Sequence, residues 1–224
     1  MAGVASSLPI VLGYLPVAVA FGISAAGVGM STGESVLISA LIFAGASQFA
    51  LVGMLAAGAP LAVASAAALA LNLRHLLYGP LIAPLLNPAG RIYAVPLAFG
   101  MTDEVFATAL ARLKEVERTR ASWLLGLEAG AYLAWVGGTF LGASSGEVLL
   151  SLSPALAPAL SFALPALFLA LLLPMLHGDG ALAALAGGGV ALVMHLLGFA
   201  AFGILGAGIA GPLFVLLLRR VRHG

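Results

Sequence analysis

Long apolar runs, separated by short polar or glycine- and proline-rich turns, fill most of the chain. A helix that crosses a lipid bilayer needs about 20 predominantly apolar residues. Runs of this length predict membrane-spanning helices over residues 9–30, 35–57, 61–86, 92–111, 122–141 and 159–176, and two more between 181 and 218 that divide near Gly198. The strict apolar–polar alternation of a membrane β-barrel is not the pattern of these runs. The sequence therefore predicts an all-α, polytopic membrane helix bundle of about eight helices, some of them broken by proline or glycine.

Polar and charged side chains interrupt three of these apolar runs. A charge at the centre of a bilayer costs roughly 2.5–3.5 kcal/mol on insertion scales, and pairing with an opposite charge relieves much of that cost. Arg74 lies near the middle of its run, as do the two carboxylates of the next run, so we predict an ion pair between them at mid-membrane depth. The candidate substrate-binding residues are Gln48, Asn72, Arg74, His75, Tyr78, Thr102, Asp103 and Glu104.

A purely structural interpretation of this cluster stays open. Consecutive helix residues point about 100° apart, so Asp103 and Glu104 cannot face the same way. One of them can pair with Arg74 while the other faces a cavity. The alternative is an ion pair that only joins two helices. Gln48 equally fits a hydrogen bond between helices.

Composition strengthens the membrane interpretation and narrows the function classes. Of the 224 residues, 62% are hydrophobic and 8% are charged, whereas soluble domains are about 25% charged. A net charge of +1 gives no indication of a nucleic-acid partner. There is no cysteine and no His-Glu-x-x-His motif, so an intramembrane enzyme is the least favoured class. We expect residues 1–224 to form a single transmembrane domain without a cofactor or metal.

Basic residues predict the orientation of the helices. They cluster between Arg112 and Arg120 and again in the tail from Arg219 to Arg222. Basic loops stay preferentially in the cytoplasm. Eight helices place both clusters and both termini there, whereas seven helices would put the tail outside. We therefore favour eight.

Four short motifs in order resemble one family. They are Pro9-Ile-Val-Leu-Gly-Tyr-Leu-Pro16 with Phe21-Gly22, Phe43-Ala-Gly-Ala-Ser-Gln-Phe49, Asn72-Leu-Arg-His-Leu-Leu-Tyr-Gly79 and Thr102-Asp-Glu104. Together they resemble the AzlC family, the large subunit of bacterial branched-chain amino acid exporters. The resemblance implies export of valine, leucine or isoleucine, a small AzlD-type membrane subunit as partner, and a plasma-membrane location. It departs at Ser161, where many members of the family have an aspartate before Phe-Ala-Leu-Pro.

The polar residues fit such a substrate on chemical grounds as well. A zwitterionic amino acid needs a cation or a helix N-terminus for its carboxylate and an acid or carbonyls for its ammonium group. Arg74 or His75 fits the first role, and Asp103 or Glu104 the second. Prolines at 16, 80 and 84 are expected to open helices around the site. We predict a secondary transporter driven by an ion or proton gradient, with a passive channel or a scaffold subunit as the alternatives.

Overall fold

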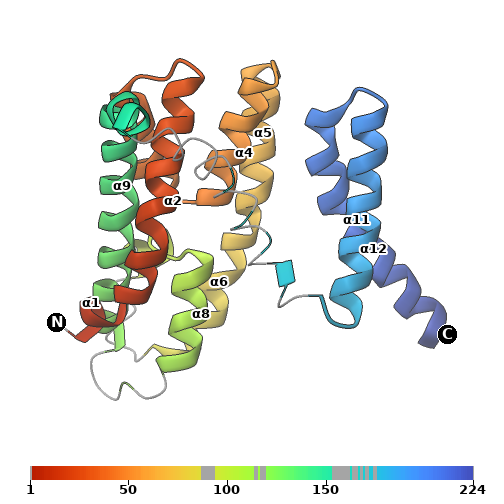
Figure 1. The fold of residues 1–224 in the computed structure, drawn as a ribbon. Coiled ribbons are helices and arrows are strands. Elements are labelled where there is room, and N and C mark those ends of the chain that lie inside the picture. Colours follow the sequence, from red (N-terminus) through yellow and green to blue (C-terminus); the bar gives the residue numbers. More distant parts are fainter. Residues whose placement is uncertain are drawn as a thin grey trace.

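In a computed structural model of the chain, every regular element of the described part is a helix (Figure 1). The structure describes residues 2–86, 94–113, 116, 120–152 and 176–223, together with the isolated positions 162, 166, 169, 172 and 173. Four helical segments in this part are long and apolar enough to cross a membrane: 8–27, 61–85, 120–146 and 179–196. The prediction of a helical membrane protein is confirmed, and the predicted count of eight spans is not.

The described helices follow in the order α1 (Ala2–Ser6), α2 (Leu8–Gly27), α3 (Thr32–Ile42), α4 (Gly45–Ala56), α5 (Leu61–Asn72), η1 (Leu73–Leu77), α6 (Tyr78–Ile82), η2 (Ala83–Leu85), α7 (Ala94–Phe99), α8 (Asp103–Arg112), α9 (Arg120–Leu152), α11 (Asp179–Leu196) and α12 (Ala200–His223), with η1 and η2 as 3₁₀ segments. Figure 1 shows α2 beside α9 and α4 beside α5, with the α11–α12 hairpin next to them.

Helices α2 and α9 pack closely because glycines line their contact. A Cβ on Gly22 of α2 would overlap the backbone of Thr139, and one on Gly142 of α9 would overlap the backbone of Val19. Small residues let membrane helices approach until their backbones touch. The α2–α9 pair is therefore closely packed. Helices α1, α3, α7 and α8 also pack against this pair.

Two of the predicted spans are broken inside the bundle. The helix predicted over 35–57 is instead α3 followed by α4, because Phe43 adopts a left-handed backbone with φ 43° and ends α3. The helix predicted over 92–111 is likewise divided into α7 and α8, between Gly100 and Thr102, and residues 91–93 lie outside the described part. Each piece is 12 residues or shorter. A span needs about 20, so none of them crosses a bilayer alone.

Prolines do not mark these breaks. Helix α2 continues through Pro16, contrary to the expectation that this residue opens a helix. Residues 61–85 form one helical run as predicted, although Leu73–Leu77 and Ala83–Leu85 tighten to 3₁₀ geometry. The polar motif of this run therefore lies on a distorted stretch rather than on a regular α-helix.

The C-terminal third corrects the sequence prediction at two points. Helix α9 extends to Leu152, so the connection predicted to begin at residue 142 is helical at first. Helices α11 and α12 reach from Asp179 to His223, beyond the predicted limits of 181 and 218, and α11 is continuous through Gly187–Gly189. The predicted division near Gly198 is confirmed, since this glycine has φ 82° between α11 and α12. Most of the helix predicted over 159–176, including Ser161, lies outside the described residues.

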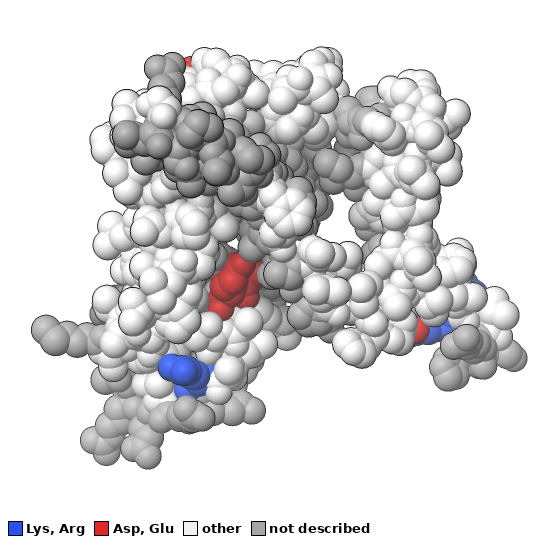
Figure 2. All heavy atoms as spheres, in the orientation of Figure 1, with Lys and Arg blue, Asp and Glu red and all other residues white. Residues whose placement is uncertain are grey.

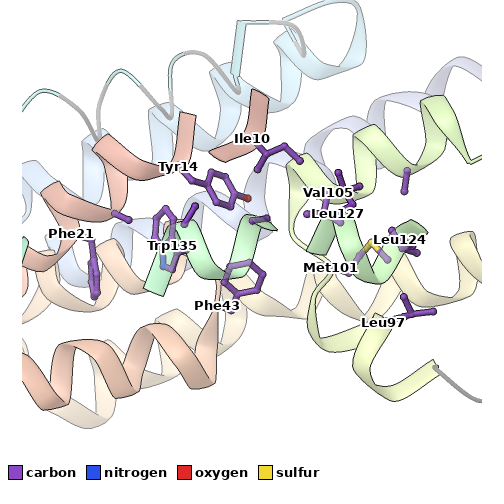
Figure 3. Close-up of a cluster of buried hydrophobic side chains, with 14 of the residues drawn as sticks. Ile10, Tyr14, Phe21, Phe43, Leu97, Met101, Val105, Leu124, Leu127 and Trp135 are labelled. Carbon is purple, nitrogen blue, oxygen red and sulfur yellow. The ribbon is translucent and has the colours of Figure 1, made fainter. Parts of the chain in front are cut away.

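The core of the described bundle is apolar and aromatic. Figure 3 shows Tyr14 of α2 beside Trp135 of α9, with Phe43 of the α3–α4 break nearby. The rings of Tyr14 and Trp135 meet edge to face at 5.2 Å, and Phe43 packs on Tyr132 at 5.1 Å. Such pairs add about 0.5–1.5 kcal/mol beyond the area they bury. The aromatic residues thus hold the α3–α4 break against α2 and α9.

Candidate functional site

A small cavity of about 30 Å³ lies where the two helix breaks approach each other. Phe43 to Ala46 of the first break and Thr102 to Glu104 of the second form much of its wall. The remaining wall comes from α2, η1 and α9, through Tyr14, Val17, His75 and Trp135. Space of this size is enough for about one water molecule. The cavity therefore places polar groups and backbone from several helices around a single water-sized space.

Two tyrosines hold the two carboxylates of the cavity. The Tyr14 hydroxyl lies 2.5 Å from Glu104 Oε2 and 2.7 Å from Thr102 Oγ1. The Tyr78 hydroxyl donates a hydrogen bond to Asp103. Both carboxylates are half-buried, and Figure 2 shows acidic atoms in a recess between the helices. Because the carboxylates are adjacent in sequence and point apart, each has its own tyrosine, from a different helix.

Two helix N-termini also face the cavity. Thr102 caps α8, its Oγ1 accepting the backbone N–H of Val105 at 3.3 Å. At the first break, α4 begins at Gly45, and the small side chains of Ala44 and Ala46 leave the backbone close to the cavity. The first N–H groups of a helix have no acceptor within the helix, and they carry a partial positive charge. The cavity therefore presents positive backbone ends beside two acids.

A buried hydrogen-bond network fixes the α3–α4 break. Gln48 Oε1 accepts the Ala44 N–H at 3.2 Å and the Trp135 Nε1–H at 2.9 Å. Gln48 Nε2 donates to Ser39 Oγ at 2.8 Å, and this hydroxyl lies 2.7 Å from that of Thr139. Buried polar groups that are fully paired make a conformation rigid and specific. Gln48 thus stabilises the backbone conformation of the α3–α4 break. It does not itself line the cavity.

The other predicted site residues fall into three groups. Thr102, Asp103, Glu104 and His75 line the cavity, and Tyr78 reaches it through its bond to Asp103. The remaining two, Asn72 and Arg74, lie on the 61–85 run, and of these only Asn72 has a described side chain, which does not line the cavity.

Asn72 is half-buried away from the cavity, and its Oδ1 has no hydrogen-bond partner among the described residues. The side chain of Arg74 lies outside the described part, so its pairing with Asp103 or Glu104 stays a prediction.

Tyr14, Trp135 and the backbone of the α3–α4 break are the site elements that the sequence reasoning missed. Tyr14 stands inside the Gly-Tyr-Leu-Pro motif that carried the family resemblance, which was the available signal. Its hydroxyl is polar within an apolar run and needs a partner when buried. That argument would have placed Tyr14 with the carboxylates.

One short motif invites a hydrolase interpretation that the structure does not support. Residues 142–146 read Gly-Ala-Ser-Ser-Gly, the spacing of a nucleophile elbow, which requires a sharp strand-to-helix turn. These residues lie within continuous α9, and Ser144 Oγ donates to the Phe140 carbonyl at 2.6 Å. The serine therefore has the ordinary helix-facing bond of a helical serine.

A bundle of apolar helices, broken at two points around buried acids and tyrosines, defines an integral membrane protein with an internal polar site. The AzlC protein family model matches residues 9–149, and the chain belongs to this family. An uncharacterized membrane protein of Archaeoglobus fulgidus is 46% identical over 211 residues, covering 94% of this chain and 91% of that protein. The inner membrane protein YgaZ of Escherichia coli K12 is 43% identical over 213 residues, covering 94% and 85%.

A second family model, MJ1155, matches residues 155–222. The uncharacterized protein MJ1155.2 of Methanocaldococcus jannaschii is 44% identical over 63 residues, which are 28% of this chain and 86% of that protein. The C-terminal segment is thus similar to a protein that exists as a separate short chain. No solved structure is significantly similar to this chain.

Proposed function

We propose that the chain is the large subunit of a secondary transporter that exports branched-chain amino acids from the cytoplasm. It works with a small AzlD-type membrane subunit and is driven by an ion or proton gradient. The observation that carries this proposal is the cavity, where two helix N-termini meet Asp103 and Glu104 inside an apolar bundle. Membership of the AzlC family supports it.

The cavity chemistry is complementary to a zwitterion. The N-terminus of α4, with small residues at Gly45 and Ala46, suits a carboxylate, as broken helices do in other transporters. Glu104, held by Tyr14, suits the ammonium group. The apolar wall formed by Val17, Phe43 and Trp135 suits a branched side chain. In this assignment the substrate carboxylate binds backbone N–H groups at the start of α4, so its binding does not require Arg74.

The size of the cavity implies that helices move during transport. At about 30 Å³ it is far smaller than the roughly 300–1,000 Å³ of ordinary ligand pockets. The half-helices α4 and α8 are short elements on either side of it. We propose that their displacement from the firm α2–α9 pair enlarges the site, first toward one side of the membrane and then the other.

Flux through reconstituted vesicles tests the proposal. The chain, co-reconstituted with its small subunit, is expected to release radiolabelled valine, leucine and isoleucine faster when a pH gradient is imposed. The 2-hydroxy acid analogue of valine lacks the ammonium group, and isobutylamine lacks the carboxylate. Both are expected to compete poorly, because each leaves one half of the site unpaired.

The alternatives give different results in the same assay. A passive channel would conduct valine without any response to the gradient. A scaffold subunit would add no flux to vesicles that contain the small subunit alone. Either outcome would contradict an amino acid exporter with the site described above. So would competition by both analogues as strong as competition by unlabelled valine.

A further inference from the structure

A second buried acid lies outside the candidate cavity. Glu128 is on α9, where its side chain is 4% exposed. Its Oε1 is buried and has no hydrogen-bond partner among the described residues. Buried acids ordinarily have hydrogen-bond or ion-pair partners, because an unpaired one loses its hydration without compensation. The position of Glu128 therefore calls for an explanation other than packing.

The carboxyl group of Glu128 lies against the end of α7. A Cβ placed on Gly100 would come within 2.6 Å of both Glu128 Cδ and Oε2, so only glycine leaves room for this contact. The two residues border an apolar groove of about 250 Å³, whose other walls are Pro96, Phe99, Leu125, Ala129 and Tyr132. The described residues that line the groove include no cation for the carboxylate.

The neighbouring helices offer no described partner either. Helix α7 and helix α1 carry no ionisable side chain in their described lengths. On α9 itself, the Tyr132 hydroxyl donates to the Ala40 carbonyl at 3.1 Å. Other elements packed against α9 carry five ionisable groups: Tyr14 on α2, Glu34 on α3, and Asp103, Glu104 and Arg112 on α8. In the described structure none of these groups forms an ion pair or a hydrogen bond with Glu128.

Glu128 is also connected to the cavity through a very short segment. Gly100, which it touches, is followed by Met101 and then by Thr102, the N-cap of α8. The Thr102 N–H donates to the Gly100 carbonyl at 3.2 Å, which makes the segment a tight turn. A change at Glu128 therefore acts on the backbone that carries Thr102 and the two carboxylates of the cavity.

We propose that Glu128 is the proton-binding site that couples a proton gradient to movement of the α7–α8 break. This inference rests on the proposed transport function and adds the ion and the residue to it. A proton from water on one side binds a carboxylate oxygen of Glu128, and the neutral acid is stable where α7 covers it. When the break moves away, water reaches the carboxyl and the proton leaves to the other side. No other bond forms or breaks.

Labelling of the wild-type protein tests the protonated state without any transport measurement. Dicyclohexylcarbodiimide reacts with protonated carboxyls in apolar surroundings. In membrane vesicles containing the full complex, we expect peptide mass spectrometry to find the label on Glu128, decreasing as the pH is raised. The exposed Glu34, whose carboxylate accepts hydrogen bonds from Ser31, should stay unlabelled. Absence of label on Glu128 at every pH would overturn the proposal.

Flux measurements then test the coupling. Glu128→Gln mimics the neutral acid permanently, so the stimulation of valine efflux by a pH gradient should be lost while gradient-free exchange of labelled for unlabelled valine continues. Glu34→Gln is the matched control and should keep the stimulation. If Glu128→Gln still responds to the gradient, Glu128 is not the coupling site, even if it is labelled. If the wild type carries no valine at all, the transport proposal fails, whereas the labelling result still decides the protonation of Glu128.

If Glu128→Gln does not insert and fold, Gly100→Ala provides a second variant. The added methyl displaces the Glu128 carboxyl from its contact. In this variant, labelling of Glu128 by the carbodiimide and stimulation of valine efflux by the pH gradient should both decrease. A Gly100→Ala protein that keeps both would contradict the proposed connection.

Discussion

Replacing Tyr14 by phenylalanine removes one hydroxyl from the candidate cavity and leaves the ring in place. The ring packs edge to face on Trp135 at 5.2 Å, and phenylalanine can keep that contact. The lost group is the hydroxyl that lies 2.5 Å from Glu104 Oε2. The variant therefore removes the contacts of this hydroxyl with Glu104 and Thr102 while it keeps the packing of the ring.

The expected size of the effect comes from the burial of the carboxylate. Hydrogen bonds to charged groups contribute about 1.5–3 kcal/mol. Glu104 is half-buried and beside a water-sized space, so water can replace part of the lost bond. We expect the lower end of the range, about 1.5 kcal/mol, which corresponds to roughly tenfold weaker binding.

Equilibrium binding of radiolabelled leucine to the purified complex measures this effect, and valine efflux provides a second readout. Tyr132→Phe is the matched control, because its hydroxyl bonds to the Ala40 carbonyl at 3.1 Å and not to either carboxylate of the cavity. The control should lose little affinity. If Tyr14→Phe folds normally and binds leucine as tightly as the wild type, Glu104 is not held for the ammonium group and the site assignment is wrong.

Two further substitutions, one control substitution and one cut test the architecture. Gly22→Ala is expected to destabilise the α2–α9 contact by about 1–3 kcal/mol, the usual cost of overpacking, measured as a lower melting temperature in detergent. Gly137→Ala has nothing within 4 Å of its added carbon and should melt like the wild type. Gln48→Leu leaves the Trp135 N–H unpaired and should lower the melting temperature too, at about 1–3 kcal/mol for each unpaired group. A protease site inserted after Leu152 allows the C-terminal segment to be cut from the rest of the chain, and efflux should continue after the cut. Loss of efflux on cleavage would mean that transport requires the C-terminal segment to stay attached.

The sequence predicted the location of the polar cluster better than its architecture. Thr102, Asp103, Glu104 and His75 do line one cavity in the described structure. The cost of burying charge requires polar groups to gather, so their proximity follows from composition and spacing alone. The pairing within the cluster does not follow, because it depends on rotamers and on which helix faces approach. Tyrosines are described partners of both carboxylates, whereas the side chain of Arg74 lies outside the described part, so its pairing with either of them stays a prediction.

The prolines of the sequence did not locate the helix breaks. Pro16 lies inside the unbroken α2, whereas α3 ends at Phe43, a residue with no local preference for positive φ. That conformation is stabilised by the Gln48 amide, which Trp135 of α9 holds in place through a hydrogen bond, and by the ring of Tyr132 beside Phe43. Strained backbone of this kind tends to mark functional sites. Tertiary contacts between residues far apart in sequence decide it, and a window of local sequence does not contain them.

The candidate chemistry found among the described residues lies in the part that matches the AzlC family. Both helix breaks, the cavity and Glu128 lie within residues 9–149. The C-terminal hairpin packs mainly on itself, and its ends are joined at the surface by the Asp179–Arg219 ion pair at 2.5 Å. The MJ1155 family model matches this segment, over residues 155–222. The proposed substrate contacts and proton coupling therefore lie within the first 149 residues, and substitutions in α11 or α12 should alter assembly or stability before they alter substrate preference.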